Sequence, residues 1–185
     1  PEIIEPARSP RLAAFVEEFY RLRRRRGVTL SEAGELMLNP NYFGAMMVHM
    51  GDAEGFVAGV SQHYPDTLRP ALQIIRTRPN VHRVAGLYVM LTKKDAYFFA
   101  DTTVNIEPTA EELAEIALLA ASMAREFDVE PRVAMLSFSN FGSTKHPLTE
   151  KVRRATELLK QKAPHLMVDG EMQADTAVVP EIIEH

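Results

Sequence analysis

Residues 108–137 read PTAEELAEIALLAASMAREFDVEPRVAMLS, and this stretch decides the fold. Thr109 and Glu112 have the spacing of a capping box, in which a hydroxyl and a carboxylate each bind a free backbone N–H at a helix start. The pattern predicts a helix that runs to about Phe127 and buries Leu113, Ile116, Ala120 and Met123. The next segment, residues 132–137, has no polar alternation, which is typical of a strand in a sheet covered on both faces.

Helices and strands continue to alternate after this strand. A polar loop with a glycine, at residues 139–147, leads into a helix whose apolar positions repeat at helical spacing from Leu148 to Leu159. A short strand at residues 165–168 and a final helix with Ala177, Val178 and Ile182 complete the order. Alternation at these lengths predicts parallel strands joined by helical crossovers, so we expect an α/β fold.

The first hundred residues alternate less regularly. Their patterns predict helices at residues 9–26, after Thr29, at 42–50 and at 65–77, and strands at 55–60, 84–92 and 97–100. Gly27 and Gly51 suit the ends of two of these helices, because glycine readily adopts the left-handed conformation found there. The sequence Arg78-Pro79-Asn80 interrupts the pattern and predicts a boundary near residues 78–84.

Composition limits the classes of function. The chain has 185 residues, of which 46% are hydrophobic and 25% charged, and this is ordinary for a globular protein with a buried core. The absence of cysteine excludes disulfides and thiolate metal sites. No apolar run is long enough to span a membrane, and the N-terminus lacks the order of a signal peptide. We therefore expect a cytoplasmic location and no membrane partner.

Charge is distributed unevenly along the chain. Residues 1–100 hold 13 Lys/Arg and 10 Asp/Glu, a net charge of +3, whereas residues 101–185 hold 8 and 15, a net charge of −7. The positive half owes its sign to Arg21 and residues 23–26. Such a run suits the negative end of a helix dipole, a phosphorylated small molecule or a nucleic acid. No aromatic interleaving or DNA-reading motif accompanies it, so no nucleic-acid partner is expected.

Ligands of an open parallel sheet bind beyond the carboxyl ends of its strands, and this rule selects four loops, at residues 61–69, 101–107, 137–145 and 169–175. In the first loop, Arg69 lies at a helix start, where its charge opposes the helix dipole. It either holds a phosphate or carboxylate ligand, or pairs with a neighbour such as Asp66. In the second loop, Asp101 and Asn105 are expected to rigidify a turn by bonding to their own backbone.

The third and fourth loops are also polar. The third offers hydroxyls and backbone N–H groups near Gly142, which suits a phosphate, although the Gly-Lys-Ser/Thr ending of a P-loop is absent and a plain connection is the alternative. The fourth contains Asp169, Glu171 and Asp175, which either begin a helix or bind Mg²⁺. The helix start is the favoured interpretation, so no metal site is expected.

Together these segments resemble the phosphate acetyl/butyryl-transferase (phosphotransacetylase) family. Four blocks carry the resemblance in the order of the family: DTLRPALQIIRT (66–77), FADTTVNIEPTAEELAEIA (99–117), RVAMLSFS (132–139) and VDGEMQAD (168–175). A weaker block, LRRRRG (22–27), lies upstream. The resemblance covers nearly the whole chain, and the joint match is highly specific.

The resemblance implies two three-layer α/β/α (Rossmann-like) subdomains with mostly parallel sheets, residues 1–83 and 84–185. A cleft between them is expected to hold coenzyme A and the acyl phosphate. Arg69 matches a family arginine of that cleft, and Arg23 matches one assigned to the phosphates of coenzyme A. The candidate contacts to acetyl-CoA or phosphate are therefore Arg69, Arg23, Thr67, Ser139, Gly142 and Ser143.

Within the family, SNFGS at residues 139–143 is similar to the loop in the C-terminal domain of bacterial hybrid NADP-dependent malic enzymes. Residues 63–64 and 102–105 point the same way. This similarity implies a regulatory module that binds acetyl-CoA as an allosteric effector, beside a malic-enzyme domain that uses NADP and a divalent metal, in a homo-oligomer. The alternatives are a fragment of an active phosphate acetyltransferase and a simple oligomerisation module.

The family's catalytic Ser-Arg pair belongs to an Asn-Asp-Leu-Ser-Arg-like motif that these 185 residues do not contain. We therefore expect no catalytic residue in this chain and a second subdomain that is incomplete at its C-terminus. A sheet without its last strands exposes an edge that another chain can pair with, which favours an oligomer.

Overall fold

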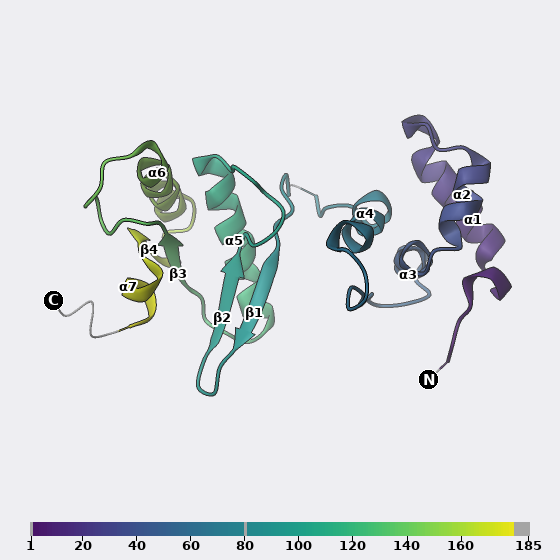
Figure 1. Ribbon diagram of the computed structural model, residues 1–185, viewed down its shortest axis with the longest axis horizontal. Coiled ribbons are helices and arrows are strands. Elements are labelled where there is room, and N and C mark those ends of the chain that lie inside the picture. The colour runs from purple at the N-terminus through teal and green to yellow at the C-terminus, as the bar shows by residue number, and fades with distance from the viewer. Residues whose placement is uncertain (1, 80, 180–185) are drawn as a thin grey trace. The chain divides into compact units, whose positions relative to one another are not determined.

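The computed structural model describes residues 2–79 and 81–179. The chain divides into two compact units, Pro1–Asn80 and Val81–His185 (Figure 1). Each unit has its own cluster of buried apolar side chains. The described helices and strands confirm the α/β class, and among the described residues no helix has the length and apolar character needed to cross a membrane.

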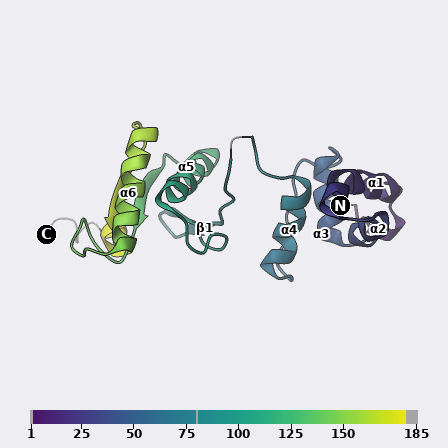
Figure 2. The ribbon, with the colours of Figure 1, turned by 90° about the horizontal axis from the view of Figure 1, so that it is seen from above.

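The described part of the first unit is helical. Its elements are η1 (Pro6–Arg8), α1 (Leu12–Arg23), η2 (Arg24–Arg26), α2 (Leu30–Met37), α3 (Pro40–His49) and α4 (Tyr64–Ile74). Helices α1, α2 and α3 pack against one another (Figure 2). The ring of Phe15 lies 4.9 Å from that of Phe43, and the ring of Phe19 meets Tyr42 edge-on at 5.5 Å. These aromatic pairs of α1 and α3 form the centre of the core.

Local signals explain where these helices begin. Thr29 and Glu32 form a capping box at the start of α2. Asn39 accepts a hydrogen bond from the backbone of Asn41, and Pro40 takes the first position of α3. Proline is tolerated there because the first backbone N–H of a helix has no partner within the helix. Pro40 therefore starts α3, whereas the sequence pattern placed the start of this helix at Tyr42.

The strand predicted at residues 55–60 is wrong. The described part of the first unit contains no strand, and the side chains of Val57 and Val60 are fully exposed. A strand needs a neighbour to accept its backbone hydrogen bonds, and an apolar run alone does not supply one. All strands of the described chain lie in the second unit.

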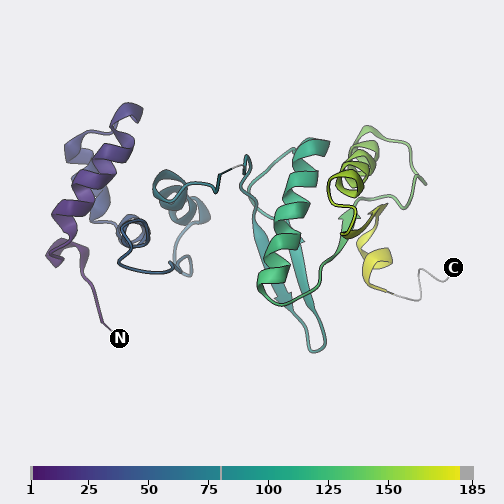
Figure 3. The same ribbon diagram turned by 180° about the vertical axis from the view of Figure 1, so that it is seen from behind.

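The second unit begins with a hairpin. Strands β1 (Leu87–Leu91) and β2 (Ala96–Ala100) are antiparallel, with Leu87 opposite Ala100 and Leu91 opposite Ala96. The turn between the two predicted strands contains Lys93, Lys94 and Asp95, and the backbone of Thr92 donates to the carbonyl of Asp95 at its base. Helix α5 (Ala110–Glu126) lies along this hairpin and contacts β2 (Figure 3). The capping box of Thr109 and Glu112 is confirmed.

Beyond α5 the chain forms β3 (Arg132–Leu136), α6 (Pro147–Lys162), β4 (Met167–Met172) and α7 (Ala174–Val178). Strands β3 and β4 are parallel and α6 connects them, as the alternation predicts. Strand β4 starts and ends later than expected, so Asp169 and Glu171 belong to the strand and not to a loop after it. Ile182, predicted in the final helix, lies outside the described residues.

The core of the second unit depends on small side chains. Helix α5 buries a row of alanines against α6 at helical spacing, Ala110, Ala114, Ala117 and Ala121. Ile116 is buried as predicted, but Met123 is exposed, so the predicted inward face is only partly correct. Alanine allows two helix backbones to approach closely, and this decides which face of α5 turns inward.

Candidate functional site

In the first unit, polar side chains of α3 bond to residues near both ends of α4. The amide of Asn41, which is buried, donates to the backbone carbonyl of Asp66 at 3.1 Å and also to the side chain of Gln62. The hydroxyl of Tyr42 donates to Oε1 of Gln73 at 3.1 Å. These contacts hold the part of α4 that carries Thr67 and Arg69.

Two of the predicted arginines lie near Tyr42. Burial raises the pKa of the Tyr42 hydroxyl, and the positive charges of Arg69 and Arg23 act against this rise. Arg23 belongs to α1 and Arg69 to α4, so two helices supply the positive charges that act on Tyr42.

Neither arginine has a carboxylate partner among the described residues. Arg69 is exposed and forms no ion pair there, so the predicted alternative of a salt bridge to Asp66 is not found. The Nε of Arg23 is buried and has no hydrogen-bond partner within residues 2–79 and 81–179. By contrast, Arg21 is held by Glu18 through two hydrogen bonds of 2.6 Å each. A buried N–H without a partner is unusual, and a ligand oxygen would satisfy it.

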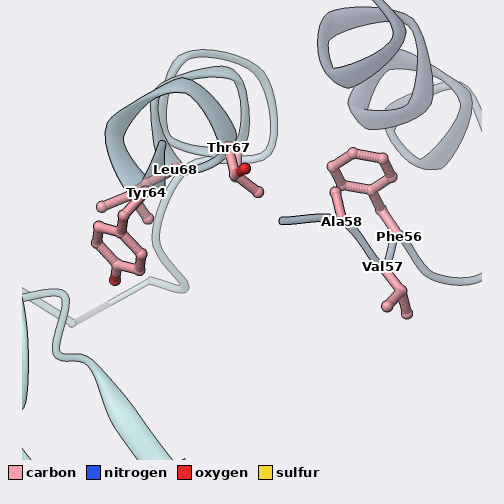
Figure 4. Close-up of a pocket in the computed structure, with 7 residues that line it drawn as sticks. Phe56, Val57, Ala58, Tyr64, Thr67 and Leu68 are labelled. Carbon is pink, nitrogen blue, oxygen red and sulfur yellow. The ribbon is translucent and has the colours of Figure 1, made fainter. Parts of the chain in front are cut away.

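Shallow hollows lie beside α4. One has a volume of about 340 Å³ and is lined by Phe56, Val57, Ala58, Tyr64, Thr67, Leu68 and Ala71 (Figure 4). Another of about 370 Å³ is lined by Pro65, Leu68, Arg69, Leu72 and Gln73. The hydroxyl oxygen of Thr67 is buried without a partner in the described part of the chain. Mostly apolar walls with a few polar groups are typical of small-molecule sites.

In the second unit, Asp101 organises the turn after β2. Its carboxylate accepts hydrogen bonds from the backbone N–H groups of Gly86, Thr103, Val104 and Asn105, at 2.6 to 3.2 Å. The side chain of Asn105 donates to the same carboxylate and to the carbonyl of Val84. The predicted structural role of Asp101 and Asn105 is therefore confirmed.

The loop after β3 contains the other three predicted contacts. Ser139 is buried, and its hydroxyl lies 2.9 Å from that of Ser143. The Oγ of Ser139 accepts the N–H of Thr144 at 3.0 Å, and the Oγ of Ser143 accepts the N–H of Asn140 at 3.2 Å. The N–H of Gly142 donates to Glu171 at 2.6 Å. In this conformation the amides of Asn140 and Thr144 donate within the loop and that of Gly142 donates to β4, so these amides do not form an open phosphate cradle.

Glu171 of β4 is completely buried beneath this loop. Its two carboxylate oxygens accept hydrogen bonds from the Nε and Nη2 of Arg153, each at 3.2 Å. Asp169 instead bonds to Lys160 at 3.0 Å, and Asp175 accepts the N–H of Thr176. The alternative of a Mg²⁺ site is not supported, because the three acids of this segment have separate partners and no metal-binding group of His, Asp and Glu occurs in the described chain.

Sequence reasoning missed the pairing of Arg153 with Glu171. One signal was present: Arg153 lies four residues after Thr149 and three before Thr156, so it shares a face of α6 with two buried residues. Its neighbour Arg154 lies on another face and pairs only with the exposed Glu157 at 3.6 Å. The other partner, Glu171, was assigned to a loop, where a buried carboxylate is not expected.

Comparison with known proteins gives a consistent result. The family model described as phosphate acetyl/butaryl transferase matches residues 1–185. A phosphate acetyltransferase of Bacillus subtilis is 47% identical over 171 residues, which cover 92% of this chain and 51% of that protein. A phosphate acetyltransferase of Thermoanaerobacterium thermosaccharolyticum is 43% identical, over 99% of this chain and 58% of its own length. The chain thus spans about half the length of these relatives.

Solved structures agree with the sequences. The EutD phosphotransacetylase from Staphylococcus aureus has a TM-score of 0.84 and 43% identity, and the match covers 99% of this chain and 56% of that one. A phosphotransacetylase from Streptococcus pyogenes has a TM-score of 0.86 and 44% identity, over 97% of this chain and 55% of that one.

These relatives correct the predicted function. A regulatory domain of an NADP-dependent malic enzyme was expected, and this prediction is wrong: relatives that match most of the chain at 43–47% identity are phosphate acetyltransferases. The similarity of residues 139–143 to the hybrid enzymes was too short to decide between subgroups. The expected malic-enzyme partner domain, and with it NADP and a divalent metal, loses its basis.

Proposed function

The chain belongs to the phosphate acetyl/butaryl transferase family. On this premise we propose that it forms part of a phosphate acetyltransferase, an enzyme that moves an acetyl group between phosphate and coenzyme A. In this reaction the sulfur of coenzyme A attacks the carbonyl carbon of acetyl phosphate. The bond from that carbon to the phosphate oxygen breaks and the thiol proton passes to the released phosphate, so the products are acetyl-CoA and inorganic phosphate. Acetyl phosphate and coenzyme A are the substrates of the proposal.

The observation that carries the proposal is the pair of arginines near Tyr42. Both substrates bear phosphate groups, and guanidinium matches phosphate with paired hydrogen bonds. Arg69 has no carboxylate partner in the described chain, and the buried Nε of Arg23 has no acceptor there. Folding thus leaves two cationic groups of the first unit with hydrogen-bonding capacity for an anion. The apolar hollows beside α4 suit the less polar arm of coenzyme A.

The test is the formation of acetyl-CoA by the full-length protein from acetyl phosphate and coenzyme A. The variants are Arg23→Gln and Arg69→Gln, and the matched control is Arg25→Gln, since Arg25 is an exposed arginine two residues after Arg23. Loss of a charge-assisted hydrogen bond to phosphate is expected to lower kcat/KM by roughly tenfold to a hundredfold in the first two variants. Arg25→Gln should retain wild-type values. Absence of thioester formation by the wild-type protein contradicts the proposed function.

A cytoplasmic location and a homo-oligomeric state stay predictions. Fractionation of cells tests the location, and light scattering of the purified protein tests the oligomeric state. The proposed acetyl transfer involves no change of oxidation state, so it needs no redox cofactor.

A further inference from the structure

The loop after β3 has an intrinsically unfavourable backbone. Two successive residues adopt left-handed conformations, Phe141 with a φ of 45° and Gly142 with a φ of 86°. Phenylalanine adopts this region reluctantly because its Cβ approaches the backbone. At Gly142 a side chain is doubly disfavoured, since a Cβ there would also lie 3.3 Å from Nη2 of Arg153. Contacts from outside the loop must compensate for this conformation.

Gln173 and Thr176 hold Asn140, and Gln173 also bonds to the carbonyl of Phe138, but the two left-handed residues are held by one residue of β4. The backbone carbonyl of Glu171 accepts the N–H of Phe141 at 2.9 Å, and its Oε1 accepts the N–H of Gly142 at 2.6 Å. Both left-handed residues therefore donate to Glu171. The bond to Gly142 is of the stronger kind, because the acceptor is a carboxylate.

Arg153 keeps this carboxylate charged. Burial acts to raise the pKa of Glu171, but the hydrogen bonds from Arg153 and Gly142 outweigh it, and the pKa is lowered from its ordinary value. The side chain of Arg153 is 39% exposed, whereas that of Glu171 is 0% exposed. Arg153 thus connects the buried carboxylate to the surface of α6.

We propose that Glu171 is a positioning residue: together with Arg153 it fixes the backbone of residues 138–144, and thereby places the exposed side chains of the loop, and not its amides, for the phosphate of acetyl phosphate. The proposal rests on the proposed function, and it assigns no direct contact between Glu171 and substrate. The polar groups that the loop presents to solvent are those of Ser143, Thr144 and Lys145, which are exposed. Their placement depends on the backbone of Phe141 and Gly142 immediately before them.

The chain offers a matched control for each partner. Asp169 lies two residues before Glu171 in the same strand, and its carboxylate bonds only to Lys160 at the surface. Arg154 follows Arg153 in α6, and it pairs with the exposed Glu157. Neither control residue bonds to the loop through its side chain in the described structure.

The experiment compares Glu171→Gln with Asp169→Asn in the full-length protein. Hydrogen exchange of the peptide that contains residues 138–144 reports the position of the loop. Loss of a hydrogen bond to a buried carboxylate is expected to accelerate exchange there by roughly tenfold to a hundredfold in Glu171→Gln, and not in Asp169→Asn. In steady-state kinetics, Glu171→Gln should raise the KM for acetyl phosphate by about tenfold, because small displacements of binding groups are costly. The KM for coenzyme A should stay near that of Asp169→Asn.

A second pair of variants covers the case in which Glu171→Gln does not fold. Arg153→Lys keeps the positive charge but loses the two-pronged hydrogen bonding, so it should loosen the loop in the same direction and by less. Arg154→Lys is its control and should leave exchange of the loop unchanged.

Two outcomes overturn the proposal. One is exchange of residues 138–144 that is the same in Glu171→Gln as in Asp169→Asn. The other is an equal rise of both KM values, since that would indicate a general loss of structure. If the wild-type protein forms no acetyl-CoA while Glu171→Gln still loosens the loop, the proposed function fails, but the positioning of the loop by Glu171 is supported.

Discussion

Asp101 shows how much a single carboxylate can determine locally. Partial burial acts to raise the pKa of Asp101, but hydrogen bonds from Asn105, Thr103 and Gly86 outweigh it and lower the pKa from 3.8 to about 2. A group whose pKa is lower in the folded state stabilises the protein at pH values above its unfolded pKa. This contribution is lost as the pH falls from about 3.8 towards 2.

We predict that Asp101→Asn lowers the free energy of unfolding at neutral pH by about 1–3 kcal/mol, because several backbone donors lose a charged acceptor. The variant should also lose less stability than the wild type between pH 3.8 and 2, the range over which Asp101 is titrated. Urea denaturation at a series of pH values measures both effects. Asp95→Asn is a control, since Asp95 has an exposed side chain in the hairpin turn. Parallel pH profiles of Asp101→Asn and wild type would contradict the role assigned to Asp101.

The structural role of Asp101 was predicted from the sequence because most of its hydrogen-bond partners lie close to it along the chain. Most bonds of Asp101 reach residues two to four positions away, and such Asx turns have a recognisable local pattern, whereas its bond to Gly86 spans 15 positions and was not predicted. The Arg153–Glu171 pair joins residues 18 positions apart, and its existence depends on how α6 crosses from β3 to β4. The Nε of Arg23 and the hydroxyl of Thr67 have no partner among the described residues, and this too reflects tertiary packing, which no local pattern encodes.

At the scale of elements, the packing of β3 against β4 requires a glycine at position 170. Gly170 lies in β4 with a φ of 141°, and a Cβ there would lie 2.6 Å from the backbone carbonyl oxygen of Met135 in β3. Neither the backbone conformation nor the space allows a side chain. Gly34 in α2 is the opposite case, because a Cβ there meets nothing within 4 Å.

The two glycines therefore give opposite predictions for the same substitution. Gly170→Ala should lower the free energy of unfolding by at least about 2 kcal/mol, from backbone strain and overpacking. Gly34→Ala should raise it by about 0.5–1 kcal/mol, since alanine restricts the unfolded chain and favours a helix. Chemical denaturation of the two variants provides the measurement. Equal effects of both substitutions would show that the space around position 170 does not limit the size of the side chain there.

Elements also show where periodicity was sufficient and where it was not. The helix start at Thr109 was predicted correctly, because a capping box is complete within four residues. The buried face of α5 was predicted only in part: Ile116 is buried and Leu113 packs against the core, but Met123 is exposed, and Ala114 and Ala121 are buried instead. The strand at residues 55–60 failed for a related reason: its formation depends on a partner strand, not on its own residues.

The whole molecule is organised around two separate cores. The cluster that contains Phe19 includes only residues of the first unit, and the cluster that contains Leu159 includes only residues of the second. No buried side chain of the described residues belongs to both clusters. Damage to one core should therefore first destabilise the unit that contains it.

Phe19→Ala and Leu159→Ala test this organisation, because both side chains are completely buried. Each truncation should destabilise its own unit by about 2–5 kcal/mol, through lost burial and the cavity left behind. Hydrogen exchange followed by mass spectrometry resolves the two units. Phe19→Ala should lower protection in α1–α4 and leave β3, α6 and β4 protected, and Leu159→Ala should do the reverse. If either variant lowers protection equally throughout residues 2–79 and 81–179, the two cores unfold as one cooperative system, and the division into units describes geometry without describing stability.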